Sequence, residues 1–150
     1  MFEFKKLCKE LEKLNPAERG VLLAEKSVSV VKGLNALDLP FNGVETLVTF
    51  IIGSVVSDGL ISENDYLYIY PSLVEAFGHD FDFKAAKQAL QIAKDIKKEI
   101  ATHTKKLLSI IANCDENLAM DIVALCLLVT SVDGKITIKE KRYIRQLCKA

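Results

Sequence analysis

The 150-residue sequence has no tryptophan, only three prolines and only seven glycines. With so few chain-breaking residues and 50% hydrophobic residues, general disorder is excluded, because enough apolar surface exists to offset the entropy lost on ordering the chain. The sequence also lacks net charge: 20 Lys and Arg balance 20 Asp and Glu, and the pI is about 6.7. Dedicated nucleic-acid-binding proteins normally carry a basic excess, so we expect no nucleic acid partner.

Long hydrophobic runs are missing as well. The most apolar segments are residues 47–56 (LVTFIIGSVV) and 122–132 (IVALCLLVTSV), and both fall short of the roughly 20 residues that cross a bilayer. We therefore expect no transmembrane segment and predict that both segments form buried core helices. The N-terminus is charged from the start and lacks the pattern of a signal peptide, which predicts a cytoplasmic protein.

Motifs of the common enzyme classes are absent too. There is no HExxH, Walker loop, GxSxG or dinucleotide-binding glycine pattern, and we expect a protein without catalytic activity. The four cysteines, Cys8, Cys114, Cys126 and Cys148, form no CxxC pair and have no neighbouring histidine. We expect reduced thiols with a structural role rather than a zinc site.

Apolar residues recur with helical spacing along the whole chain, and alternation typical of strands is almost absent. The pattern predicts an all-α, single-domain helical bundle covering residues 1–150, with about seven helices and no strand pair. The expected helices cover residues 2–14, 16–37, 44–57, 62–77, 83–112, 115–132 and 138–148. Pro71 is expected to break or kink the fourth helix, since proline cannot donate the helical hydrogen bond.

One motif occurs twice. Residues 57–69 (SDGLISENDYLYI) align without a gap with residues 132–144 (VDGKITIKEKRYI), 75 positions further on. Each copy follows one of the two apolar segments. The alignment predicts an internal pseudo-repeat of two helix–loop–helix units.

A structural role explains most of this motif. The glycines can adopt the left-handed conformation that ends a helix, and the isoleucines can anchor the loop in the core. Ser62 with Asp65, and Thr137 with Glu140, have the spacing of a capping box. The remaining aspartates, Asp58 and Asp133, can accept a backbone N–H two residues further on.

A metal site is a more specific interpretation of the motif than a structural role. The motif is similar to the second half of an EF-hand loop, but the early ligand positions hold Ser54, Val56, Val129 and Ser131. Because calcium needs six or more oxygen ligands, a working EF-hand is excluded. A looser site for a divalent metal ion would combine Asp58, Asp65, Asp133 and Glu140, provided that the two loops are adjacent.

The paired pattern of apolar helix, DGxI[ST]xx[DE] and second helix resembles the TerB-like domain of tellurite-resistance proteins. The specific signal covers about residues 57–69 and 132–144. The resemblance implies a bundle of seven or eight helices and a non-catalytic role in tellurite or other stress responses. It also implies protein partners that are membrane-associated or handle metals, and metal binding by the four acidic residues named above. Asp65 stands where the family usually has Glu.

The alternative is a protein-interaction scaffold with purely structural loops. Its contact surface would be the aromatic segment 66–83, which holds six of the eleven aromatic residues, or a lysine stripe on the predicted helix 83–112. The stripe consists of Lys84, Lys87, Lys94, Lys98 and Lys105. The sequence leaves homo-oligomerisation open.

Overall fold

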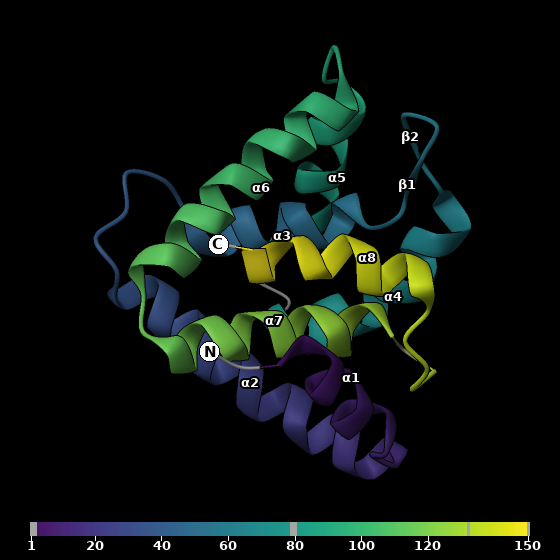
Figure 1. Ribbon diagram of the computed structural model, residues 1–150. Helices are drawn as coiled ribbons and strands as arrows, with labels where there is room; N and C mark the ends of the chain where they lie inside the picture. Colours follow the sequence, from purple (N-terminus) through teal and green to yellow (C-terminus); the bar gives the residue numbers. More distant parts are fainter. Residues whose placement is uncertain (1–2, 79–80, 132, 150) are drawn as a thin grey trace.

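The computed structural model describes residues 3–78, 81–131 and 133–149 (Figure 1). Within these ranges the chain forms eight α-helices and one very small sheet, which confirms the predicted all-α bundle. The helices are α1 (Phe4–Glu12), α2 (Pro16–Ala36), α3 (Gly43–Gly53), α4 (Glu63–Phe77), α5 (Phe83–Gln91), α6 (Ile96–Asn113), α7 (Glu116–Thr130) and α8 (Ile138–Arg145). Strands β1 (Val56–Ser57) and β2 (Leu60–Ile61) pair between α3 and α4, and a 3₁₀ turn (Gln146–Lys149) follows α8. Phe2 and Val132, which lie at the edges of predicted segments, are outside the described residues.

The prediction of one helix over residues 83–112 is wrong, because α5 and α6 are separate helices. Asp95 is the N-cap of α6, and its side chain accepts a hydrogen bond from the Lys98 N–H at 3.1 Å. An aspartate with this bond satisfies a free N–H of a helix start and so favours a new helix at that point. The apolar spacing continues through the break, and periodicity therefore did not reveal it.

Of the break or kink predicted at Pro71, the break does not occur, since α4 continues through this residue. The proline removes one N–H donor, which is the donor to the Leu67 carbonyl. The buried face of α4, which includes Ile69 and Leu73, packs against α2 and α7. This tertiary packing outweighs the loss of one hydrogen bond.

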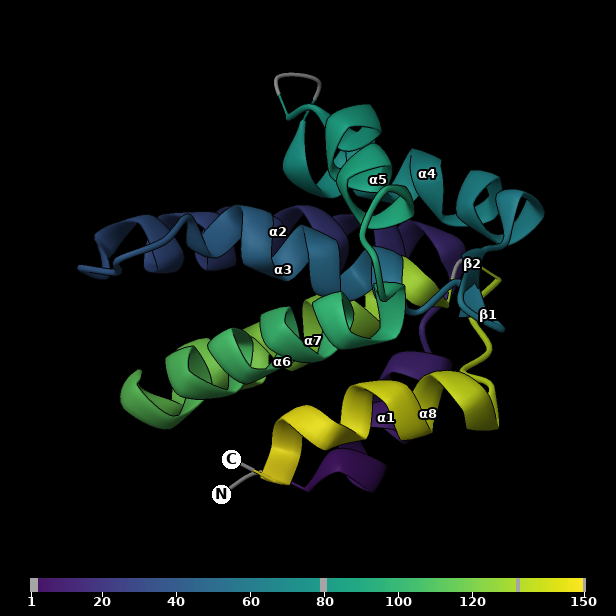
Figure 2. The same ribbon diagram turned by 90° about the horizontal axis from the view of Figure 1, so that it is seen from above.

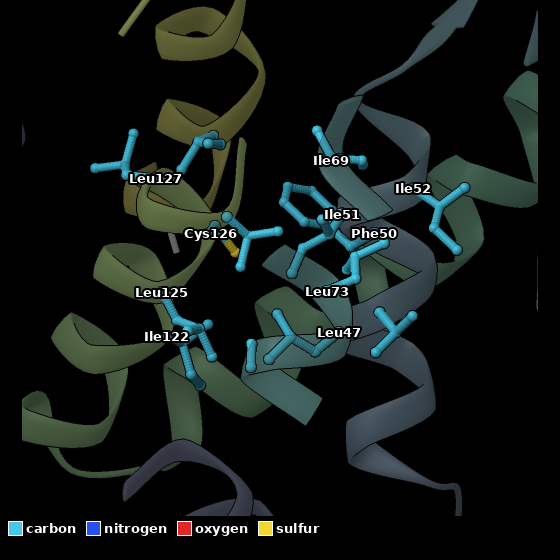
Figure 3. Packing of buried hydrophobic residues seen from close by; sticks show 14 of the residues in the cluster. Leu47, Phe50, Ile51, Ile52, Ile69, Leu73, Ile122, Leu125, Cys126 and Leu127 are labelled. Atoms are coloured by element: carbon cyan, nitrogen blue, oxygen red, sulfur yellow. The ribbon is translucent and has the colours of Figure 1, made fainter. Parts of the chain in front are cut away.

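The two apolar segments form the centre of the core, as predicted. Nearly every residue of α3 is buried, and so is most of α7. Figure 3 shows side chains of α3, α4 and α7 filling the space between these helices, among them Phe50, Leu73 and Leu125. Cys126 lies in this core as a free thiol, and burial raises its pKa, so it acts as a small hydrophobic residue.

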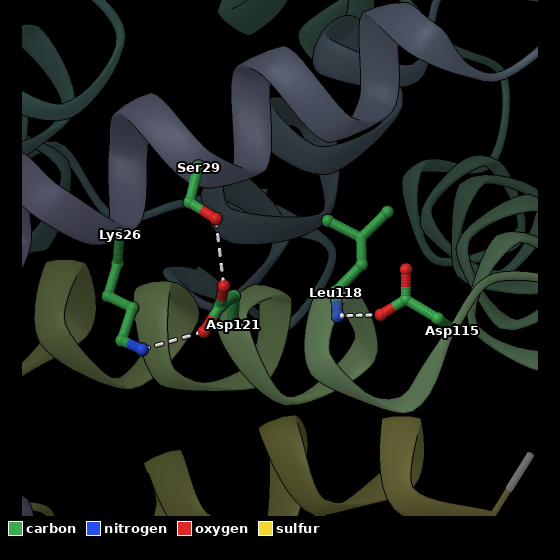
Figure 4. A network of polar contacts seen from close by, with 5 residues as sticks. All are labelled: Lys26, Ser29, Asp115, Leu118 and Asp121. Carbon is green, nitrogen blue, oxygen red and sulfur yellow. Dashed lines mark hydrogen bonds and ion pairs between the residues drawn. The ribbon is translucent and has the colours of Figure 1, made fainter.

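The helices form layers. In Figure 2, α2 and α3 lie next to α6 and α7, with α4 and α5 on one side and α1 and α8 on the other. Asp121 of α7 helps to hold α2, because it accepts hydrogen bonds from Lys26 at 2.7 Å and from Ser29 at 2.9 Å (Figure 4). In the described part of the chain, none of the helices combines the length and the apolar character that crossing a membrane requires.

Candidate functional site

The first copy of the repeated motif forms a β-hairpin. Val56 pairs with Ile61 and Ser57 with Leu60, and Asp58 and Gly59 form the turn with φ angles of 52° and 80°. A two-residue turn with positive φ at both positions is the type that joins hairpin strands, and Asp-Gly is a preferred sequence for it. The expectations that α3 continues to residue 57 and that no strand pair occurs are therefore wrong.

The second copy forms a different loop. Gly134 has a φ of 84°, and its N–H donates to the Ser131 carbonyl at 3.0 Å. Asp133 Oδ1 accepts a hydrogen bond from the Lys135 N–H at 3.1 Å, as predicted for an aspartate that stabilises a turn. The left-handed glycines are thus confirmed in both copies, although Gly59 turns a hairpin and does not end a helix.

Both motifs continue into helix N-caps at the predicted residues. The full capping box is not formed at Ser62, because the Ser62 N–H donates to the Val55 carbonyl at 2.9 Å. Ser62 accepts from the Asp65 N–H at 3.4 Å, and Thr137 accepts from the Glu140 N–H at 3.1 Å. The Thr137 hydroxyl also donates to Glu140 Oε1 at 3.0 Å. The motif isoleucines, Ile61 and Ile136, are buried as expected. Capping and anchoring therefore account for most of the motif.

Arg19 of α2 contacts the start of the second loop, although neither copy of the motif predicts it. Its side chain is 9% exposed and donates to Ser131 Oγ at 2.9 Å and to the Leu11 carbonyl at 3.3 Å. Burial lowers the pKa of Arg19, and the negative charges of Asp133 and Glu140 act in the opposite direction. Arg19 is thus an internal counter-charge for the second loop. Helical spacing alone could have found it, because Arg19 lies on the buried face of α2 with Leu23, Ser27, Val30 and Leu34.

The structure brings three of the four predicted ligands together. Asp65, Asp133 and Glu140 line one pocket of about 390 Å³ between the two loops. Asp58 at the tip of the hairpin turn is not among its lining residues. We call this pocket the interloop pocket. Its other lining residues are Ser54, Val55, Tyr68, Thr130, Thr137 and Lys139.

The Glu140 carboxylate of the interloop pocket is partly buried. Burial raises its pKa, the hydrogen bonds from Thr137 oppose this shift, and the charge of Asp133 adds to it. Glu140 Oε2 is shielded from water and has no hydrogen-bond partner among the described residues. The interloop pocket thus contains a buried carboxylate oxygen that the hydrogen bonds of the loop do not use.

The three carboxylates do not form a ready metal centre. In the described ranges, no group of three or more His, Cys, Asp or Glu side chains is placed so that it could hold a metal ion. Asp133 and Glu140 already accept hydrogen bonds within their own loop, and Arg19 supplies a positive charge beside them. The pocket can offer a cation separate carboxylates, with water needed to complete any coordination shell.

No family model matches this chain, and neither a curated protein nor a solved structure matches it. The TerB-like resemblance therefore depends on the residues of the two repeats.

Proposed function

We propose that this chain is a non-catalytic, TerB-like binding module of the cytoplasm that holds a protein partner in a stress-response or metal-related pathway. The observation that carries the proposal is an exposed apolar surface on α4. Leu67 and Tyr70, which we call the α4 face, lie about one helical turn apart and are 62% and 40% exposed. Large apolar side chains that gather on a surface in contact with water are typical of a protein-binding site.

The aromatic residue of this surface, Tyr70, packs against two other aromatic rings. The Tyr70 ring lies 5.9 Å from the ring of Tyr66 and 5.9 Å from that of Phe83, and both of these residues are buried. Lys87 of α5 lies 4.5 Å above the Tyr66 ring and pairs with Glu63 at 2.7 Å. An aromatic side chain that is already ordered loses little entropy on binding, which makes Tyr70 a suitable anchor for a partner.

The repeated loops support the same proposal, because several of their polar groups form hydrogen bonds within the protein. Asp133 stabilises its own turn, Thr137 caps α8, and Arg19 binds Ser131. Loops built in this way hold helices in place. The lysine stripe is a weaker candidate surface, since the break between α5 and α6 divides it and Lys87 is already paired.

Site-specific photo-crosslinking in cells that make the protein tests the α4 face. A photoreactive residue at Leu67 is expected to capture one defined partner. The same residue at Val28 of α2, which is 68% exposed, serves as the matched control and is expected to capture none. With the purified partner, Tyr70→Ala should weaken binding by about 2 kcal/mol. Equal capture at both positions, or capture at Val28 alone, would overturn the proposal.

A divalent metal ion in the interloop pocket is the second candidate. The observation in its favour is that Asp65, Asp133 and Glu140 line one pocket, in which Glu140 Oε2 has no partner among the described residues. Carboxylate oxygens with added water are suitable ligands for Mg²⁺. Asp58 would have no part in such a site.

An NMR titration of the metal-stripped protein with calcium, magnesium, manganese and zinc tests this candidate. Metal binding predicts saturating changes at the amides of Gly134 and Glu140, and Asp65→Asn should abolish them. Asp58→Asn is the matched control, because it removes the same charge from the same motif outside the pocket. Amides that do not move at millimolar metal would leave the loops with a structural role alone.

A further inference from the structure

Charge is distributed unevenly along the chain although the total is zero. Residues 135–150 contain six Lys and Arg and one Glu, which is a net charge of +5, so the other 134 residues carry −5. This basic C-terminal segment includes α8 and follows it to the end of the chain. A neutral protein with separated charges can still attract an anion to one face.

Helix α1 adds further positive charge to the same face. A groove of about 360 Å³ runs between α1 and α8, and we call it the α1–α8 groove. Its cationic lining residues are Lys5, Lys9, Lys141, Arg142 and Arg145, and its apolar lining residues are Phe4, Cys8 and Ile138. No described carboxylate lines it. In Figure 2 the two helices form the outermost layer on the side away from α4 and α5.

Most of these cations are accessible to a ligand. Lys5, Lys9, Arg142 and Arg145 are exposed, and Lys141 has a long contact of 3.9 Å with Glu12. Arginine presents a planar fork of donors that matches the oxygens of a phosphate group, and lysine adds a flexible positive charge. The arrangement of two cationic rows on opposite helices therefore fits an oxyanion between them.

The apolar residues define the ligand further. Cys8 is 2% exposed and forms part of the floor, whereas Ile138 is 71% exposed at the start of α8. A bare ion would use the cations and leave Ile138 in contact with water. A ligand that joins an anionic head to a short apolar part would use both.

We propose that the α1–α8 groove binds the phosphate group of an anionic amphiphile, with the glycerol or first acyl groups of the ligand against Phe4 and Ile138. The same chemistry occurs in a free phosphate ester and in the headgroup of an anionic phospholipid. The groove is separate from both the α4 face and the interloop pocket. Each proposal can therefore fail without the others.

Two sets of probes distinguish the sources of the phosphate. NMR titrations with sn-glycerol 3-phosphate and with soluble dihexanoylphosphatidylglycerol should move the amides of Lys9 and Arg142 and leave that of Lys105 on α6 unchanged. Sedimentation with phosphatidylcholine vesicles, with and without phosphatidylglycerol, measures binding to a bilayer. Saturation by glycerol 3-phosphate without binding to the anionic vesicles assigns a free ester. Binding to the anionic vesicles, with or without binding of the dihexanoyl compound, assigns a membrane headgroup.

A charge-matched pair of variants tests the groove itself. Lys5→Glu with Arg145→Glu reverses one exposed cation on each side of the groove and should weaken binding at least about tenfold. Lys97→Glu with Lys105→Glu makes the same change in net charge on exposed positions of α6 and should bind as the wild type does. Circular dichroism confirms that both variants are folded.

Four results would overturn the proposal. The first is an equal loss of binding in both double variants, which indicates attraction by net charge. The second is the absence of any amide shift or vesicle binding. The third is binding of inorganic phosphate as tight as that of the dihexanoyl compound, which removes the apolar part from recognition. The fourth is binding of a polyglutamate peptide without binding of either phosphate ester, which would assign the groove to an acidic protein.

Discussion

The guanidinium group of Arg19 on α2 binds Ser131 at the end of α7 through both the hydroxyl and the backbone carbonyl of the serine. A third hydrogen bond, to the Leu11 carbonyl, reaches α1. One nearly buried cation thus connects three helices at the point where the second loop begins. The carboxylates of Asp133 and Glu140 favour the charged form of Arg19 at this position.

Removal of this cation should destabilise the fold. Arg19→Met leaves the Ser131 and Leu11 carbonyls without their charged donor and the two carboxylates without a counter-charge, and we expect a loss of about 3 kcal/mol. Urea unfolding measures it. Lys32→Met, at an exposed position of the same helix, should change stability by no more than about 0.5 kcal/mol. Similar losses in the two variants would show that Arg19 has no special role.

His103 on α6 should make stability depend on pH. Burial lowers its pKa from 6.5, the charge of Lys106 adds to this shift, and Glu99 opposes it. A histidine with a lowered pKa binds fewer protons in the folded state than in the unfolded state. The free energy of unfolding therefore falls as the pH drops through 6.5 and then through the lowered pKa.

The measurement is urea unfolding of the wild type and of His103→Gln from about pH 7 to about pH 5. The wild type should lose more stability over this range than the variant, because glutamine does not titrate. An equal loss of stability in the wild type and in His103→Gln would show that His103 does not cause the pH dependence.

Gly53 at the end of α3 should tolerate no side chain. A Cβ at this position would overlap the Tyr143 hydroxyl and lie 2.9 Å from Ile100 Cγ2. Gly53→Ala should therefore destabilise the protein by about 2 kcal/mol, since the packed core cannot yield without strain. Gly20, inside α2, has no atom within 4 Å of its added Cβ. Gly20→Ala should stabilise the protein by about 0.5 to 1 kcal/mol, and thermal unfolding compares the two signs.

Equivalent tyrosines of the repeat should respond differently to loss of the hydroxyl. Tyr143 stacks on Phe50 with ring centroids 4.6 Å apart and donates to the Phe50 carbonyl, whereas Tyr68 is 50% exposed. Tyr143→Phe should cost about 1 kcal/mol, and Tyr68→Phe should have almost no effect on stability. Equal effects in urea unfolding would mean that the two halves of the repeat have the same packing at this position.

Much of the fold was predictable because local chemistry specifies it. Asn15 and Glu18 form a complete capping box, with Pro16 at the first position of α2, as helix-start residues predict. The buried isoleucines and the N-caps of the repeat were predictable for the same reason, since each depends on residues a few positions apart. The sequence pattern does not reveal the break before α6, because the apolar spacing continues on both sides of Asp95. The passage of α4 through Pro71 was missed because packing against other helices supplies the compensating energy.

By itself, the sequence determined the helical class, the two central apolar helices and the two capped loops, since periodicity and capping depend on residues within a few positions of one another. Only the tertiary structure decided which loop residues meet. It placed Asp65 with Asp133 and Glu140, left Asp58 outside their pocket, and brought Arg19 to Ser131 across 112 positions. It also placed the cations of α1 and those of α8, which lie at opposite ends of the chain, in one groove. Such contacts depend on how the helices pack, and the spacing of residues along the sequence does not specify that packing.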